Sequence, residues 1–188
     1  MRLLPSLFVS VALLAAQPAL SAAQTLDTLS FAKKLKLAKV GDEEAQLAVA
    51  RAYEKGEDTT VDTAEAAKWY RAAAEQGNLE AQFRLGRLVQ DGAPGLKQNP
   101  EAAAKLYEGA AKQGHVEAQN WLGYAYQHGL GVPKSKENAM LWYSRAAEAG
   151  LAEAENNLGL MYLNAKGDAR DLDKAFAMFE KAAKQGDD

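Results

Sequence analysis

The amino-acid sequence predicts an all-α protein, a right-handed α-solenoid of antiparallel helix pairs. The first observation behind this prediction is a glycine that recurs at intervals of 36, 37, 36 and 36 residues, at Gly41, Gly77, Gly114, Gly150 and Gly186. The second is that the segments between these glycines share the same pattern of small and apolar residues. A fixed period of 20 to 50 residues is typical of stacked repeats, in which neighbouring units bury a continuous core.

The first helix of each unit, helix A, is predicted by apolar residues in steps of four. The first position of the stripe, here called the marker alanine, is Ala45, Ala81, Ala118 and Ala154 in the four units. The second is Val49, Leu85, Leu122 and Leu158, and the third is Tyr53, Val89, Tyr126 and Tyr162. This spacing forms one stripe on a helix. Gly86, Gly123 and Gly159 lie beside the stripe, although glycine costs about 1 kcal/mol of helix propensity relative to alanine. We therefore expect a second helix to pack closely at these glycines.

The second helix, helix B, is predicted by a polar residue four positions before a recurring alanine in every unit. These residues are Asp62, Asn99, Ser135 and Asp171. All four are strong N-cap types, because their side chains can accept a hydrogen bond from an unpaired amide of the first turn. Each helix B then ends at the next glycine of the period, as glycine readily adopts the left-handed conformation that follows a helix.

Residues 1–23 have the pattern of a secretory signal peptide. Arg2 provides a positive start, an apolar stretch runs from Leu7 to Ala16, and Ser21, Ala22 and Ala23 provide the small residues that a signal peptidase accommodates. The apolar stretch is about half of the roughly 20 residues that a membrane-spanning helix needs. We therefore expect cleavage after Ala23, a periplasmic or extracellular protein, and no stable membrane insertion of the mature chain.

The rest of the chain divides into a capping segment and four repeats. Residues 24–40 are expected to form a helix, from about Leu26 to Lys39, that covers the open face of the first unit. Residues 41–188 hold the repeats, with boundaries at 41–76, 77–113, 114–149 and 150–186. The four lysines between Lys33 and Lys39 indicate a solvated helix face, with contact to an anionic membrane surface as the alternative.

Composition excludes several kinds of chemistry. The 188 residues carry a net charge of −3 and no strongly basic segment, so nucleic acid is not an expected partner. The chain has no cysteine and two histidines, His115 and His128, without ligand-like spacing. No phosphate-binding loop or nucleophile motif occurs. We therefore predict no catalytic residues, no metal site and no cofactor, and we interpret Glu44, Glu80, Glu117 and Glu153 as charges that complement helix N-termini.

The pattern resembles the Sel1-like repeat family, a relative of tetratricopeptide repeats with a longer loop inside the unit. The third unit matches best, with Leu122-Gly123, Tyr126, the loop Gly129–Pro133, Trp142-Tyr143, Ala146-Ala147 and Gly150. The first unit departs with Val49-Ala50, the second with Val89 and the fourth with Ala165. The resemblance implies an adaptor or regulator rather than an enzyme. Secreted bacterial members of the family take part in exopolysaccharide production, envelope signalling and host contact.

A partner is expected on helix A, which lines the concave side of such a stack. We predict that the groove positions are those two, three and six residues after each marker alanine. In the first unit these are Leu47, Ala48 and Arg51. In the others, the predicted partner-binding residues are Phe83, Arg84, Arg87, Asn120, Trp121, Tyr124, Asn156, Asn157 and Leu160. Arginine and aromatic residues often anchor interfaces, and asparagine amides can bond a peptide backbone.

We expect the groove to take a peptide segment of another envelope protein, with an acidic or carboxylate-bearing residue near Arg84 and Arg87. Two alternatives stay open. Phe83 and Trp121 can instead pack inward between helices, and the same surface can serve a glycan-binding protein or an envelope hydrolase. The sequence leaves the oligomeric state open.

Overall fold

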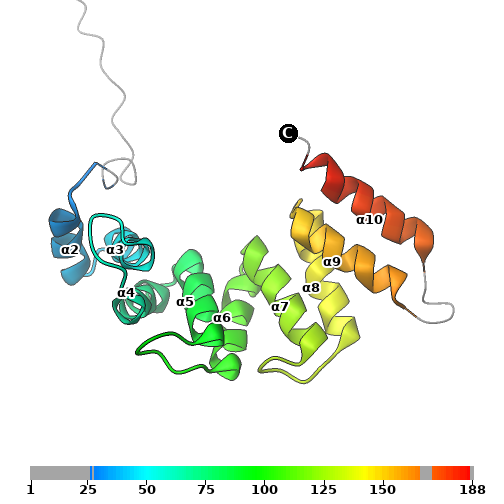
Figure 1. Cartoon of the computed structure of the whole chain (residues 1–188), viewed down its shortest axis with the longest axis horizontal. Helices are drawn as coiled ribbons and strands as arrows, with labels where there is room; N and C mark the ends of the chain where they lie inside the picture. Colours follow the sequence, from blue (N-terminus) through cyan, green and yellow to red (C-terminus); the bar gives the residue numbers. More distant parts are fainter. Residues whose placement is uncertain (1–25, 27, 166–170, 187–188) are drawn as a thin grey trace, which may run out of the picture.

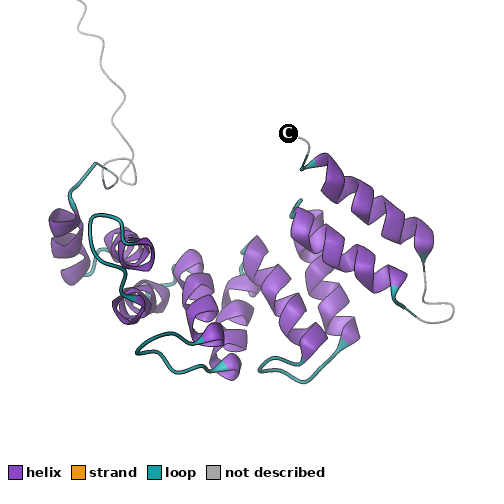
Figure 2. Ribbon diagram, viewed as in Figure 1, coloured by secondary structure: helices purple, strands orange, loops and turns teal. Residues whose placement is uncertain are grey.

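The computed structural model describes residues 26, 28–165 and 171–186, and within these ranges the regular structure is helical. The helices are α2 (Phe31–Lys39), α3 (Glu43–Lys55), α4 (Thr63–Glu75), α5 (Leu79–Asp91), α6 (Pro100–Lys112), α7 (Val116–His128), α8 (Lys136–Glu148), α9 (Ala152–Leu163) and α10 (Leu172–Lys184). The prediction of an all-α repeat fold is confirmed (Figure 2).

The helices follow one another along an arc (Figure 1). Each helix packs against the helix before it and the helix after it, from α2 to α10. The pairs α3/α4, α5/α6, α7/α8 and α9/α10 correspond to helices A and B of the four units. At the N-terminal arm of the arc, α3 lies nearer to the hollow than its partner α4.

The predicted N-caps of helix B are confirmed in all four units. The side chains of Asp62, Asn99, Ser135 and Asp171 accept hydrogen bonds from the amides of Glu65, Ala102, Asn138 and Lys174 at 2.9–3.1 Å. The backbone amide of each cap residue also donates to a carbonyl near the end of the preceding helix A, those of Tyr53, Val89, Tyr126 and Tyr162. The loop between the two helices is therefore closed in the same way in every repeat.

The glycines beside the helix A stripe receive an aromatic ring of helix B. A Cβ atom added at Gly123 would lie 2.8 Å from a carbon of the Tyr143 ring, and one at Gly159 would lie 2.7 Å from a carbon of the Phe179 ring. Gly86 faces Tyr107 in the same manner, at 2.6 Å. The expected close packing is present, and the group that needs the space is a ring rather than a helix backbone.

A glycine in the loop of the third unit is needed for a different reason, which is contact with the backbone of the preceding unit. At Gly131, with φ +69°, an added Cβ would lie 2.1 Å from the carbonyl oxygen of Pro100, the first residue of α6. The loop therefore lies directly on the backbone of the preceding unit, which joins the two units through main-chain contact.

Glutamine side chains join consecutive units. Gln46, Gln82 and Gln119 each follow the marker alanine, and their side-chain amides donate to the carbonyl oxygens of Ala38, Ala74 and Ala111 in the last turn of the preceding helix. These bonds satisfy carbonyl groups that a helix end leaves without intrahelical partners. The sequence analysis did not identify them.

The capping helix is shorter than expected. It begins at Phe31, with Ser30 in an extended conformation as N-cap, rather than near Leu26. The amides of Lys33 and Lys34 both donate to the Ser30 carbonyl, which fixes the first turn at this point. Leu26 is nevertheless buried and packs with Ala38, Ala45 and Val49 against α3. The segment therefore covers the N-terminal face of the first unit.

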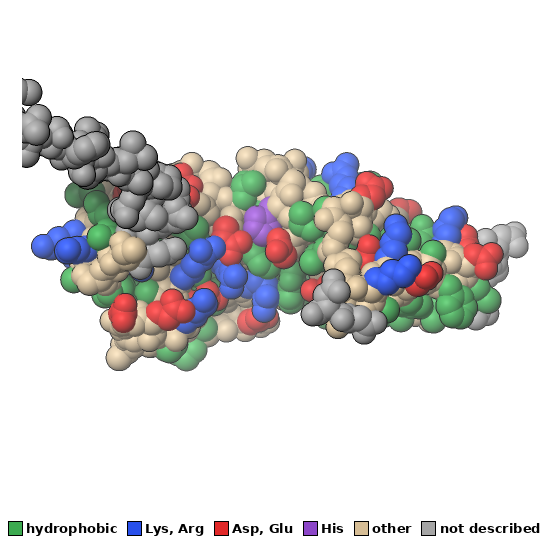
Figure 3. All heavy atoms as spheres, turned by 90° about the horizontal axis from the view of Figure 1, so that it is seen from above, with side chains coloured by type: hydrophobic (Ala, Val, Ile, Leu, Met, Phe, Trp, Pro, Cys, Tyr) green, Lys and Arg blue, Asp and Glu red, His purple; other side chains and the backbone are tan. Residues whose placement is uncertain are grey.

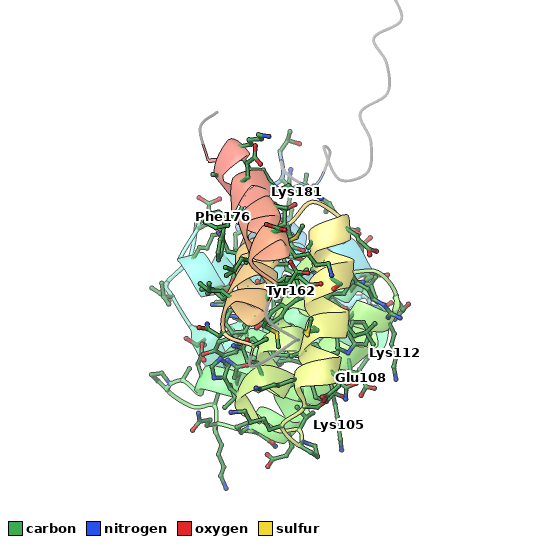
Figure 4. All side chains as sticks on the ribbon, turned by 90° about the vertical axis from the view of Figure 1, so that its right-hand side faces the viewer. Lys105, Glu108, Lys112, Tyr162, Phe176 and Lys181 are labelled. Carbon is green, nitrogen blue, oxygen red and sulfur yellow. The ribbon has the colours of Figure 1, made fainter. Side chains whose placement is uncertain are left out.

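The opposite end of the stack carries exposed apolar residues. Phe176 projects from α10 (Figure 4), and its side chain is 72% exposed. Leu160 and Leu172 are also exposed. The predicted signal peptide, at residues 1–23, lies outside the described residues. Within the described ranges, no helix combines the length and apolar character needed to cross a membrane.

Candidate functional site

The first predicted groove position, two residues after the marker alanine, lies inside the stack. Phe83 is 6% exposed and belongs to the main core, and Asn120 is 2% exposed. The side chain of Asn120 accepts a hydrogen bond from Asn157 of the next unit at 3.0 Å. The structure therefore places Phe83 and Asn120 in packing between units, where they cannot contact a partner, and this corrects the sequence-based assignment.

The same position is open in the last unit. Asn156, the counterpart of Asn120, is exposed on α9. Leu47 in the first unit is buried, like Phe83 and Asn120. Burial at this position thus comes from the helix A of a following unit, and Asn156 has no such helix against it among the described residues.

The second groove position holds a charged network in the second unit. The Glu80 carboxylate accepts a hydrogen bond from Arg84 Nε at 2.7 Å and forms an ion pair with Arg51 at 3.3 Å. Arg84 also lies 3.8 Å from the carboxylate of Glu54, which in turn accepts a hydrogen bond from the buried Tyr70 hydroxyl. Arg84 is therefore already matched with two carboxylates of its own chain, so it is not the free cation that the sequence analysis expected.

His115 completes this network from the third unit. Its Nδ1 accepts from the amide of Ala118 as the N-cap of α7, so the neutral ring carries its proton on Nε2 and donates it to Glu80 at 3.1 Å. This bond, followed by the interactions with Arg84 and Arg51, lowers the pKa of Glu80 to about 2. Seen from above the arc, Lys and Arg side chains lie beside Asp and Glu side chains, with a histidine near the middle (Figure 3).

A stack of aromatic rings follows the network along the groove. The Trp121 ring lies 6.1 Å from the Tyr107 ring and 5.8 Å from the Tyr124 ring, and Tyr124 lies 4.2 Å from the His128 ring, all between centroids. The Arg87 guanidinium carbon sits 4.3 Å from the centre of a Trp121 ring, within the range of a cation–π interaction. The structure thus brings together the predicted residues Arg87, Trp121 and Tyr124.

Two hollows lie beside these residues. The smaller, of about 370 Å³, is bordered by both Trp121 and Tyr124. Its other lining residues are Gln90, Asp91, Gln98, Pro100 and Leu130. A second hollow of about 520 Å³ continues toward α9 and includes His128, Met140, Leu160 and Tyr162, with Lys134 and Lys136 among its other lining residues. The exposed Leu160 therefore belongs to a surface that extends the aromatic stack.

The sequence analysis missed several members of this surface, and a signal for them exists. His115 and Glu80 are 35 residues apart, Asn78 and Glu43 are 35 apart, and Asn157 and Asn120 are 37 apart, and each pair is hydrogen-bonded. These separations equal about one repeat. A search for complementary polar residues one period apart would therefore have found them, including the role of Glu80 beyond its position at a helix N-terminus.

No group of three or more histidine, aspartate or glutamate side chains is placed to hold a metal ion in the described part of the chain. The arrangement instead offers one ring-stacked arginine, exposed aromatic edges and shallow apolar hollows on the inner helices. Surfaces of this composition are suited to binding a segment of another protein.

Comparison with known proteins agrees with this description. The Sel1 repeat family model matches residues 43–78, 79–115, 116–151 and 152–187. A search of curated proteins found no match. Sel1 repeat proteins generally mediate protein–protein interactions and are typically non-catalytic scaffolds.

Two solved structures show the similarity in three dimensions. A Sel1 repeat protein from Oxalobacter formigenes is 35% identical, with a TM-score of 0.76 over 82% of this chain and 63% of its own. A protective antigen of uropathogenic Escherichia coli strains, which displays an SLR fold, is 29% identical, with a TM-score of 0.75 over 87% of this chain and 34% of its own. This chain therefore spans 63% of the first relative's length and about a third of the second's. Four matched repeats and this shared architecture show that the chain belongs to the Sel1 repeat family.

Proposed function

We propose that this protein is a periplasmic, non-catalytic adaptor or regulator that binds a segment of another envelope protein on the inner face of its A helices. The observation that carries the proposal is the continuous surface formed by Arg87, Trp121, Tyr124 and Leu160. These residues are exposed or half-buried on α5, α7 and α9, although the positions around them are tightly packed.

Three further observations support the proposal. The repeats belong to a family that generally mediates protein–protein interactions. The residues at the groove positions vary between units, as Arg87, Tyr124 and Leu160 do, whereas the marker positions of the packing stripe stay nearly constant. The signal-peptide pattern of residues 1–23 directs the chain across a membrane. A partner in exopolysaccharide production or in sensor-kinase signalling would fit this location.

Photo-cross-linking in the native cells tests the proposal. A photo-reactive amino acid is placed at Tyr124 or at Leu160, and the adducts are identified by mass spectrometry. Leu141 on α8 is the matched control, because both Leu141 and Leu160 are 46% exposed but Leu141 belongs to a helix B. We expect one envelope protein to be captured at positions 124 and 160 and not at position 141.

Capture of the same proteins at all three positions would contradict the groove assignment. The exposed rings of Trp121 and Tyr124 are also a surface on which a sugar ring can stack. A screen of the protein against peptidoglycan and polysaccharide fragments is therefore the second arm of the experiment. Specific glycan binding that is lost in Trp121→Ala, without any protein capture, would favour a glycan-binding protein instead.

A further inference from the structure

The arginines on the inner face differ in whether their charge is matched. Arg51 and Arg84 form ion pairs with Glu80. Arg87, one turn further along α5 than Arg84, forms no ion pair with any described residue and rests on the ring of Trp121. The half-buried Arg87 is therefore a cation without an ion-pair partner among the described residues.

Two hydrogen-bond donors at this place also lack acceptors. Arg87 Nε and the hydroxyl of Tyr107 are buried and have no hydrogen-bond partner among the described residues. In the neighbouring units the equivalent tyrosines are satisfied, because Tyr70 donates to Glu54 and Tyr143 donates to Gln127. A buried donor without an acceptor destabilises the folded state. The junction between the second and third units is thus short of acceptor oxygens.

A partner carboxylate has the charge that the half-buried Arg87 guanidinium lacks, whereas the buried Nε and the buried Tyr107 hydroxyl lie out of its reach. Its two oxygens match the forked donors of a guanidinium group, which makes such pairs strong and directional. The hollow of about 370 Å³ that Trp121 borders is also lined by Asp91, which would repel a second carboxylate, and by Pro100, Leu130 and the Tyr124 ring. That hollow is therefore suited to an apolar side chain.

We infer that Arg87, held on Trp121, is the anchor for one carboxylate of the partner segment, and that the neighbouring hollow takes an apolar side chain beside that carboxylate. This inference rests on the proposed function and makes it specific. The carboxylate is an aspartate or glutamate side chain or the end of the partner chain. Arg84 does not take this role, because Glu80 and Glu54 already neutralise it.

Peptide selection tests the inference on the full mature chain. The protein is used to select binders from a displayed library of random ten-residue peptides with free carboxyl ends. Selected peptides are then synthesised in three forms: as selected, with each acidic residue changed to its amide, and with an amidated end. Affinities are measured by fluorescence anisotropy of labelled peptides. The second and third forms distinguish a side-chain carboxylate from a terminal one.

We expect the selected peptides to bind at least about tenfold more tightly with the carboxylate than with the matching amide. In Arg87→Gln this preference should disappear, and in Arg87→Lys it should be reduced but retained. Arg145→Gln is the matched control, since Arg145 also rests on a tryptophan, Trp142 at 4.6 Å, but on helix α8. Circular dichroism of each variant confirms that the helices are intact.

Three results would overturn the inference. The first is a carboxylate preference that persists in Arg87→Gln or is lost in Arg84→Gln instead. The second is tight binding that needs Trp121 but shows no carboxylate preference, which would leave the proposed function standing without this anchor. The third is the absence of any selected peptide together with the absence of protein capture at Tyr124, which would overturn both proposals.

Discussion

At the scale of single residues, chemically identical side chains have different roles because of what lies one repeat away. Arg84 and Arg87 are on the same helix, three residues apart. Glu54 of the first unit and Glu80 hold Arg84, whereas Trp121 of the third unit supports Arg87 without neutralising it. The sequence predicted both arginines as partner contacts, since it shows residue types and helix faces but not which carboxylates a neighbouring unit supplies.

Acid sensitivity is the first prediction at this scale. The pKa of Glu80 in the folded protein is about 2, below its ordinary value of 4.5. The folded state therefore binds fewer protons than the unfolded state between these values, and the stabilisation by ionised Glu80 is complete above about pH 4.5 and lost as the pH falls toward 2. We expect the difference in unfolding free energy between the wild type and Glu80→Gln to shrink over this range.

Urea unfolding at pH 7, 4.5, 3 and 2 measures this difference. Glu137→Gln provides the comparison, because Glu137 is exposed on α8 and its carboxylate bonds only local groups, its own backbone amide and the Ser135 side chain, rather than groups of another unit. A Glu80 carboxyl that titrates near 4.5 in a direct NMR titration would contradict the assignment of the network.

At the scale of helices, the repeated contacts follow from patterns that the sequence displays. The N-caps of the B helices and the apolar stripe of the A helices were predicted, because both depend on residues close together in the chain. The burial of Asn120 was not predicted, and that of Phe83 was only an open alternative, because both depend on how far one unit is displaced from the next. Helical periodicity gives the direction of a side chain but not the distance to the following helix.

The contact between glycine and ring gives the second prediction. Gly123→Ala should lower the unfolding free energy by about 1–2 kcal/mol, since the new methyl group overlaps the Tyr143 ring while the gain in helix propensity offsets part of this cost. A moderate cost is expected because the first unit holds Ala50 at the equivalent position.

Gly109→Ala is the control with the opposite sign. Gly109 lies within α6, where an added Cβ would meet only the flexible end of the Gln82 side chain, at 3.2 Å. This variant should be stabilised by up to about 1 kcal/mol. Thermal and urea unfolding of both variants measure these differences. Equal stability of Gly123→Ala and Gly109→Ala would contradict the interpretation.

At the scale of the whole molecule, the period of about 36 residues was sufficient to predict the number and order of the helix pairs. The capping helix was predicted in place but not in length, because Leu26 is buried without belonging to α2. The candidate site could be predicted only in outline. Its charges lie on different units and depend on contacts between side chains about 35 residues apart.

The location of the protein gives the third prediction. Cleavage between Ala23 and Gln24 should leave Gln24 as the first residue of the mature chain, which should be released with the periplasmic fraction on osmotic shock. N-terminal sequencing or intact-mass measurement of that fraction checks this outcome. Ala23→Arg should block cleavage and hold the longer form in the membrane fraction, whereas a full-length chain in the cytoplasm of the wild type would contradict a periplasmic role.

The packing of each helix chiefly against its neighbours in the chain has a mechanical consequence. Small rotations at successive junctions add along the arc. The distance between its two arms is therefore the dimension of the molecule that changes most easily. The stiffness of that dimension depends on junction residues such as Gln119, which bonds the end of α6, and Asn120, which bonds Asn157. Substitutions at these junctions should therefore change how wide a ligand the arc accepts, even though neither side chain can reach that ligand.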